Sequence, residues 1–305
     1  MRLYAGVDGG QTATQAVIGD DSGVILGRGE GGPANHVDEP GAHERLRRAV
    51  GDALRGALRS AGIPSATLLE SVHVALTGEV EPRRTAAVGE IVRAMRLTVG
   101  HDAPAAWMGA FAGAPGVVVI AGTGSVSYGR NGEGRDVRVG GWGYLFGDRG
   151  SAFWLAAEAI RRALDVHDRG RESALGDAAR HHFGVGALTE IPAAFYGRAL
   201  SRDRLASFAP LVTAMARDGD VAAEGLVAEA GHALAELAGV ALDRLDMRAG
   251  LVAAVGGMAS DALVRAAMQR ELSLRGAEMR EPQAEPVVGA LWLARAESPG
   301  ADAQR

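Results

Sequence analysis

The sequence predicts a two-lobed α/β protein, and three observations lead to that fold class. With 305 residues, the chain is long for one hydrophobic core and comfortable for two. Strand-like apolar runs alternate with segments of helical periodicity. One layout, in which a strand enters a glycine-threonine turn and two further strands follow, occurs twice, at residues 3–26 and 117–139. We therefore expect an α/β sheet core in each lobe.

The two copies of this layout are similar element by element. Strands are expected at residues 3–7, 14–18 and 24–26 in the first copy, and at 117–120, 126–129 and 137–139 in the second. Glycines let backbone N–H groups approach an anion closely, and hydroxyls add uncharged donors. Either turn alone is more typical of an ordinary hairpin, but two turns in the same layout indicate a nucleotide-dependent phosphotransferase. The turns read Asp8-Gly9-Gly10-Gln11-Thr12 and Gly122-Thr123-Gly124-Ser125.

The other elements follow from periodicity. Leu46, Val50, Leu54 and Leu58 recur at helical spacing and predict a helix within residues 39–61. The remaining pattern predicts strands at 72–76, 97–99 and 251–255, and helices at 85–95, 103–112, 152–164, 260–270 and 289–296, with 192–245 mostly helical.

Composition excludes several classes of protein. The net charge of −5, without a block of basic residues, argues against a nucleic-acid groove. No apolar stretch is expected to reach the roughly 20 residues of a membrane span, and the N-terminus lacks the features of a signal peptide. The chain has no Cys, which excludes disulfides and iron–sulfur clusters. We expect a cytoplasmic protein that binds neither nucleic acid nor membrane.

All 32 basic residues are Arg, and the chain contains no Lys. This excludes a Walker-A loop and a protein-kinase-type strand lysine, both of which place Lys on phosphate. Phosphate must therefore be bound by backbone N–H groups, hydroxyls, a metal ion or Arg.

Six motifs together resemble the sugar-kinase branch of the actin, Hsp70 and hexokinase superfamily. Within it the chain resembles the BadF/BadG/BcrA/BcrD ATPase family, and most of all its N-acetylglucosamine kinases. The resemblance implies two ribonuclease-H-like lobes with an active-site cleft between them. It places residues 1–113 and a returning helix at 286–298 in the first lobe, and 114–285 in the second. The motifs are the two turns, Ala34-Asn35-His36, His101-Asp102-Ala103, Gly141-Trp142-Gly143 through Gly147-Asp148, and Val255-Gly256-Gly257.

The resemblance implies ATP and Mg²⁺ as cofactors. Asp8 would hold the magnesium ion through water, which fits an ion that keeps several waters and takes one or two carboxylates. The alternative for Asp8 is an aspartate that only caps its turn. The residues implied in nucleotide binding are Gly9, Gly10, Gln11, Thr12, Gly122, Thr123, Gly124, Ser125, Ala216, Gly256 and Gly257.

Asp102 is the implied catalytic residue, which takes the proton of the acceptor hydroxyl and contacts the substrate. It follows a strand and begins a helix, where the helix N-terminus favours a carboxylate. The alternative is a helix-capping aspartate without another role. His101 beside it is interpreted as a strand or rim residue, and the other His residues lack metal-ligand spacing.

The implied sugar-binding residues are Asn35, Gly141, Trp142, Gly143 and Asp148. Asn35 and Asp148 would bind sugar hydroxyls, and the Gly141-Trp142 backbone would lie near the acetamido group. For Trp142, simple core packing is the alternative.

The predicted function is phosphorylation of the 6-hydroxyl of an amino sugar, N-acetylglucosamine in the first place. Glucosamine or N-acetylmuramic acid kinase activity, an ATPase acting on a protein partner, and a catalytically silent sugar sensor remain alternatives. A homodimer is left open. Three residues depart from the family pattern. Arg149, where a Glu is usual, would put a cation beside the sugar or phosphate site, and the other two, Gln11 and Ala13, lie in the first turn.

Overall fold

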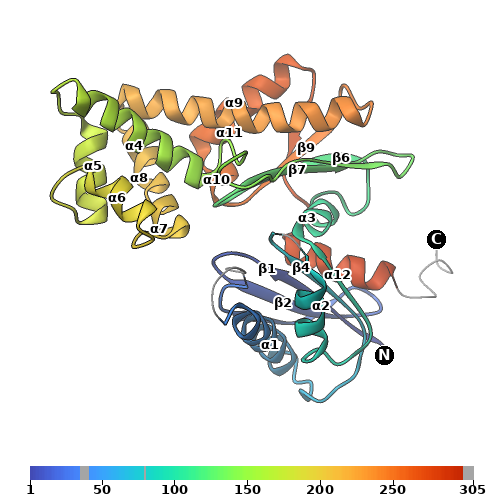
Figure 1. Cartoon of the computed structure of the whole chain (residues 1–305). Coiled ribbons are helices and arrows are strands. Elements are labelled where there is room, and N and C mark those ends of the chain that lie inside the picture. Colours follow the sequence, from blue (N-terminus) through green and yellow to red (C-terminus); the bar gives the residue numbers. More distant parts are fainter. Residues whose placement is uncertain (35–40, 79, 298–305) are drawn as a thin grey trace. The chain divides into compact units, whose positions relative to one another are not determined.

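The computed structural model describes residues 1–34, 41–78 and 80–297, and it divides into two compact units. Unit 1 comprises residues 1–114 and the chain from Pro282 onward, and unit 2 comprises Pro115–Glu281. Each unit contains one five-stranded sheet (Figure 1). The predicted α/β fold class, with one sheet in each lobe, is confirmed.

Unit 1 has the strand order β3-β2-β1-β4-β5. The first three strands are antiparallel, while β4 and β5 run parallel to β1. The strands are β1 Leu3–Gly9, β2 Thr14–Asp20, β3 Ile25–Gly31, β4 Leu69–Leu76 and β5 Ala94–His101. The helices are α1 Ala42–Ser60, α2 Pro82–Gly89, α3 Asp102–Phe111 and α12 Pro286–Ala296.

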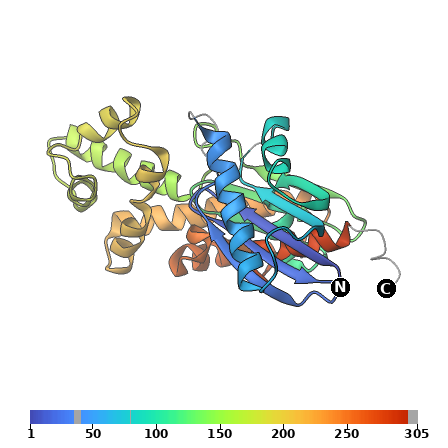
Figure 2. The same cartoon turned by 90° about the horizontal axis from the view of Figure 1, so that it is seen from below.

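The two faces of this sheet are covered by different helices. Successive side chains of a strand point to opposite faces. In β1, Ala5 and Val7 belong to the cluster packed with α1, whereas Tyr4 packs with Val287 and Leu291 of α12. Figure 2 shows α1 lying along the strands. Both α12 side chains have no exposed surface, and burial of each stabilises the unit by roughly 1.5–3 kcal/mol.

Two glycines bring α12 into backbone contact with its neighbours. A Cβ atom at Gly6 of β1 would lie 2.2 Å from the amide nitrogen of Leu291, and one at Gly289 would lie 2.0 Å from the carbonyl oxygen of Ala105 in α3. Because backbone cannot yield as a flexible side chain can, α12 fits on this face only when both positions lack a side chain.

Unit 2 has the strand order β10-β9-β6-β7-β8, in which β6, β9 and β10 are parallel and β7 and β8 continue antiparallel. Helices α4 to α8 gather on one side of unit 2 in Figure 1. The strands are β6 Gly116–Ala121, β7 Ser125–Arg130, β8 Asp136–Gly140, β9 Leu251–Val255 and β10 Glu278–Arg280. The helices are α4 Ala152–Asp168, α5 Ala174–Phe183, α6 Glu190–Tyr196, α7 Arg202–Ala206, α8 Ala209–Arg217, α9 Val221–Arg244, α10 Gly257–Ser260 and α11 Ala262–Leu274.

Helix α9 is the core helix of unit 2. It packs against β6, β7 and β8 and against α11. Within the described part of the chain, α9 is the one helix with the length and apolar composition of a membrane span, contrary to the sequence-based expectation that no stretch has them. Most of that stretch is buried inside the unit, which accounts for its apolar character.

The strand expected at 24–26 extends to Gly31 as β3, and two other predicted boundaries are wrong for reasons that the structure shows. The helix expected at 85–95 ends at Gly89, and Met95 belongs to β5, where Ala94 pairs with Leu69 of β4. Long-range pairing decides the conformation of this short apolar segment, which local periodicity cannot do. The helix expected at 260–270 begins at Ala262, because the side chain of Asp261 accepts hydrogen bonds from the amides of Leu263 and Val264.

Candidate active site

The first glycine-threonine turn is fixed to the ends of two strands in unit 1. The amide of Gly10 donates to the carbonyl of Ala13 at 3.0 Å, and the amide of Thr77, just after β4, donates to the carbonyl of Gly9 at 3.0 Å. Thr12 is exposed, so its hydroxyl is accessible. Gly9 has a packing role, since a Cβ there would lie 2.6 Å from the Leu76 side chain.

Asp102 lies at the start of α3, directly after β5. The hydroxyl of Thr77 donates to its Oδ2 at 2.8 Å. Nδ1 of the preceding residue, His101, lies 2.9 Å from the carbonyl oxygen of Gly78, within hydrogen-bonding distance. The ends of β4 and β5 therefore hold one oxygen of this carboxylate in a defined position.

Asp8 lies close to Asp102 at the end of β1, and its electrostatics are unusual. Burial and, next, the Asp102 charge raise the pKa of Asp8 to about 7. Among the described residues, no Arg or His forms an ion pair with Asp8. Two adjacent acids without a cation on Asp8 are the kind of oxygen donors that Mg²⁺ accepts. No group of three metal-binding side chains exists in the described ranges, so nucleotide phosphates and water would complete the coordination.

Arg84 of α2 is a buried residue of this region that the sequence analysis missed. Its side chain donates from Nη1 to the carbonyl oxygen of Thr77 at 3.1 Å and from Nη2 to that of Ala34 at 3.4 Å. Burial lowers the pKa of Arg84, while the Glu81 and Asp102 carboxylates oppose that shift. One guanidinium thus fixes the backbone that carries Thr77.

The second glycine-threonine turn lies in unit 2, between β6 and β7. The amide of Ala152, in the first turn of α4, donates to the carbonyl of Gly122 at 2.8 Å, and that of Phe153 donates to the carbonyl of Thr123 at 3.4 Å. The hydroxyl of Ser125 donates to the carbonyl of Arg149 at 2.8 Å. The hydrogen of this hydroxyl is therefore used inside the unit, whereas Thr123 is only partly buried.

The loop after β8 contains the predicted sugar-binding residues of unit 2. The amide of Gly141 donates to the carbonyl of Ser125 at 3.1 Å, which joins this loop to the second turn. Trp142 is 73% exposed, so the core-packing alternative is wrong. At Gly143 a side chain would meet open space. Asp148, by contrast, is 6% exposed and pairs with Arg202 of α7 at 2.8 Å.

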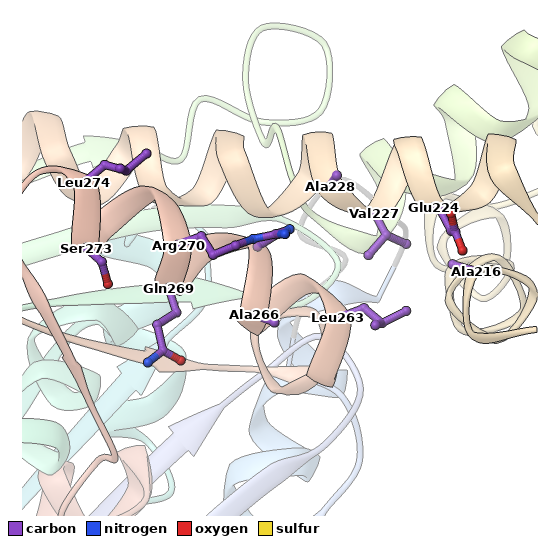
Figure 3. A pocket seen from close by; sticks show the side chains of 11 residues that line it. Ala216, Glu224, Val227, Ala228, Leu263, Ala266, Gln269, Arg270, Ser273 and Leu274 are labelled. Atoms are coloured by element: carbon purple, nitrogen blue, oxygen red, sulfur yellow. The ribbon is translucent and has the colours of Figure 1, made fainter. Parts of the chain in front are cut away.

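The residues assigned to the adenosine lie in two places. Gly256 has a φ of +99°, and a Cβ there would lie 2.5 Å from the carbonyl oxygen of Ala121, so the end of β9 requires glycine. Gly257 borders open space. Ala216 lines one end of a groove of about 930 Å³ between α9 and α11, which Figure 3 shows with Leu263 near that end.

The sequence of this chain matches the model of one protein family over residues 5–294. The chain belongs to the BadF/BadG/BcrA/BcrD ATPase family. The predicted family is thereby confirmed.

Among the relatives of this family member, the N-acetylmuramic acid/N-acetylglucosamine kinase of Clostridium acetobutylicum is 26% identical over 77% of each chain. The glucosamine kinase of Vibrio cholerae is 31% identical over 72% of this chain and 74% of its own. A crystal structure from Chromobacterium violaceum, provisionally assigned as an N-acetylglucosamine kinase, superposes with a TM-score of 0.78 at 30% identity, covering 96% of this chain and 99% of that one.

Of two further predictions about single residues, the structure leaves the first untested and corrects the second. Asn35 lies outside the described residues. Arg149, expected to place a cation beside the sugar or phosphate, pairs with Glu236 of α9 at 3.3 Å. The cation beside Asp148 is instead Arg202, for which the sequence offered no signal.

Proposed function

We propose that this BadF/BadG/BcrA/BcrD family member transfers the γ-phosphoryl group of ATP to the 6-hydroxyl of an amino sugar, N-acetylglucosamine in the first place. The predicted class, an ATP-dependent carbohydrate kinase, is confirmed by the family and by relatives that are named as amino-sugar kinases. The individual residue roles below are proposals.

The observation that carries this function is the hydrogen bond from Thr77 to Asp102. Phosphoryl transfer needs an acceptor hydroxyl in line with the γ-phosphate and a group that takes its proton. The Thr77 hydroxyl holds Oδ2 of Asp102 at 2.8 Å and so orients the carboxylate, and we assign Oδ1 to the sugar 6-hydroxyl. The hydroxyl oxygen bonds to the γ-phosphorus, the bond to the β–γ bridging oxygen breaks, and the hydroxyl proton passes to Oδ1.

Phosphate binding is assigned to the two turns. The hydroxyls of Thr12 and Thr123 supply donors without a lysine, together with backbone N–H groups of the two turns other than those of Gly10 and Gly122, which donate to Ala13 and Gly124. We assign Mg²⁺ to Asp8, whose carboxylate lacks a described cationic partner. When bound, Mg²⁺ neutralises phosphate charge as the transfer proceeds.

We assign the adenine ring to the Ala216 end of the groove between α9 and α11. Ala216, Val227 and Leu263 supply apolar contacts there (Figure 3). Nucleotide bases bind in clefts lined mainly by such side chains. Gly256 and Gly257, at the end of β9, then remain for the ribose and phosphate side of the nucleotide.

Sugar recognition is assigned to Asn35, Asp148 and the Gly141-Trp142-Gly143 backbone. Trp142 is exposed enough to cover one face of a sugar ring. Because the relatives named above act on N-acetylglucosamine, N-acetylmuramic acid and glucosamine, the acetamido group and the C3 substituent are the features that a substrate panel must vary.

A coupled assay of ADP release tests the proposal. The full chain with Mg-ATP should release ADP on addition of N-acetylglucosamine, and NMR should locate the phosphate on O6. The matched control is 6-deoxy-N-acetylglucosamine, which should give no release above background. Glucosamine and N-acetylmuramic acid complete the panel, and ADP release that ignores every sugar would favour an ATPase acting on a protein partner.

A further inference from the structure

Arg202 of α7 holds the carboxylate of Asp148 from within unit 2. Its Nη2 donates to Oδ2 of Asp148 at 2.8 Å. The side chain of Arg202 is 27% exposed and that of Asp148 is 6% exposed, so water screens this pair only weakly. Charge-assisted bonds of this kind are stronger than bonds between neutral groups.

An aromatic wall fixes the Arg202 guanidinium. Its Cζ lies 5.3 Å from the ring centroid of Tyr144 and 5.9 Å from that of Phe153. The two rings themselves are 4.8 Å apart. A cation above packed rings is stabilised and loses the freedom of an exposed arginine.

The Arg202–Asp148 pair also packs directly on the second glycine-threonine turn. A Cβ atom at Gly124 would lie 2.7 Å from Oδ2 of Asp148 and 3.0 Å from Nη2 of Arg202. Position 124 therefore has no room for a side chain, because the ion pair occupies the space beside it.

Asp148 itself needs this support. It is a non-glycine residue with a φ of +55°, a strained conformation that persists only where its surroundings hold it. Burial raises the pKa of Asp148, while Arg202 and the backbone amides of Ser125 and Gly143 oppose the shift. Arg202 is the one charged side chain among these opposing groups.

We propose that Arg202 is the positioning residue for Asp148 in sugar recognition, because it holds Oδ2 and so fixes the orientation in which the carboxylate accepts a sugar hydroxyl. This inference rests on the proposed function. It assigns the role to a residue 54 positions away in sequence and denies it to the neighbouring Arg149, whose guanidinium binds Glu236.

The experiment compares Arg202→Met, Arg202→Lys, Asp148→Asn and the double variant, with Arg149→Met as the matched control. Arg202→Met should raise the sugar KM about 10- to 100-fold, the range expected for loss of a hydrogen bond to a charged group. The ATP KM and kcat should stay within about 3-fold, since the inferred role is in binding the sugar alone. Arg202→Lys should recover part of the loss, and Arg149→Met should match the wild type.

The double variant decides whether Arg202 acts through Asp148. If it does, Arg202→Met should add less than about 3-fold to the sugar KM of Asp148→Asn, because coupled residues are non-additive. Additive effects would overturn the inference, as would a lower Tm with an unchanged sugar KM. If Arg202→Met does not fold, Arg202→Lys and its double variant with Asp148→Asn give the same cycle. Wild-type protein that phosphorylates no sugar would overturn the proposed function and this inference together, whereas an unaffected Arg202→Met with active wild type overturns only the inference.

Discussion

The two units differ in the partners that they give to an aspartate. In unit 2, Asp148 has its own cation, since Arg202 binds it at 2.8 Å against an aromatic wall. In unit 1, Asp8 lies near a second acid, Asp102, and has no ion-pair partner among the described side chains. Burial raises the pKa of both Asp8 and Asp148.

Under the proposed function, this difference separates sugar binding from the chemistry of phosphoryl transfer. A carboxylate that is already compensated can accept hydrogen bonds from a neutral sugar without an added ion. A pair of acids that share a site favours the arrival of a cation or a proton. We therefore assign the metal and proton-transfer side of the proposed reaction to unit 1, and the preorganised acceptor of sugar hydroxyls to unit 2.

The largest effect is expected from Asp102→Asn. If the unit 1 acids serve the chemistry, kcat should fall about 10²- to 10⁴-fold, the usual contribution of a general base. The fold and ATP binding should persist, because the amide can still accept the Thr77 hydrogen bond. Steady-state kinetics with Asp148→Asn as the comparison measure this, since Asp148→Asn should raise mainly the sugar KM. Near-normal turnover in Asp102→Asn would remove the basis of the comparison.

Arg84→Met tests the buried arginine of unit 1. Arg84 binds backbone carbonyl groups, whereas Arg202 of unit 2 binds a carboxylate. Arg84 is 2% exposed, and its loss leaves the carbonyls of Ala34 and Thr77 without that donor. The free energy of unfolding should drop by about 1–3 kcal/mol. Urea unfolding measures it, with the exposed neighbour Arg83→Met as the control. Equal stability of the two variants would contradict a structural role for Arg84.

The sequence pattern predicted those elements whose conformation is determined by neighbouring residues in the chain. The two glycine-threonine turns, Asp102 at a strand-to-helix junction and the α12 helix were all predicted from short stretches of sequence. Each depends on residues within one or two turns of chain. The boundary between α2 and β5 was missed because the pairing of Ala94 with Leu69 is a long-range event.

The side chains that orient the site were not predictable for the same reason. Thr77 and Asp102 are 25 residues apart, and Arg202 and Asp148 are 54 apart. In a chain with 32 basic residues, all Arg, nothing local distinguishes Arg202 or Arg84 from the others. The sequence instead drew attention to Arg149, which is adjacent to Asp148 but binds Glu236. Only the fold identifies the partners.

Thr77→Val should have a moderate effect on turnover. Removing the hydroxyl removes its hydrogen bond to Oδ2, so the carboxylate group of Asp102 is held less firmly. The kcat should therefore fall about 10-fold, as expected for one hydrogen bond to a charged group. The sugar KM should change less than kcat. Thr77→Ser, which keeps the hydroxyl, is the control and should retain most of the activity. Equal kinetics for the Val and Ser variants would show that Thr77 does not orient the carboxylate.

The smallest effect is expected on the thermal stability of Asp8→Asn without ligands. This measurement tests the comparison between the two units most directly. The pKa of Asp8 is raised from 3.8 to about 7, so the folded state disfavours the ionised form. The resulting destabilisation is absent below about pH 4, grows between pH 4 and 7, and is complete above pH 7. Asp8→Asn removes it but buries an amide in its place, so the net gain at pH 8 should be roughly 1 kcal/mol, a rise in Tm of about 2–4 °C, with a smaller gain at pH 5.

Mg²⁺ then distinguishes a cation site from simple strain. Adding Mg²⁺ to the ADP complex should stabilise wild-type protein at pH 8 and have a much smaller effect on Asp8→Asn, because the ion binds the carboxylate that the substitution removes. Asp148→Asn is the control from the other unit: it should lose stability, since the partly buried Arg202 guanidinium loses its charged partner, and should keep the response to Mg²⁺. A Tm for Asp8→Asn that does not exceed the wild-type value at pH 8 would mean that Asp8 is already compensated in the folded protein, and the contrast between the two carboxylates would no longer hold.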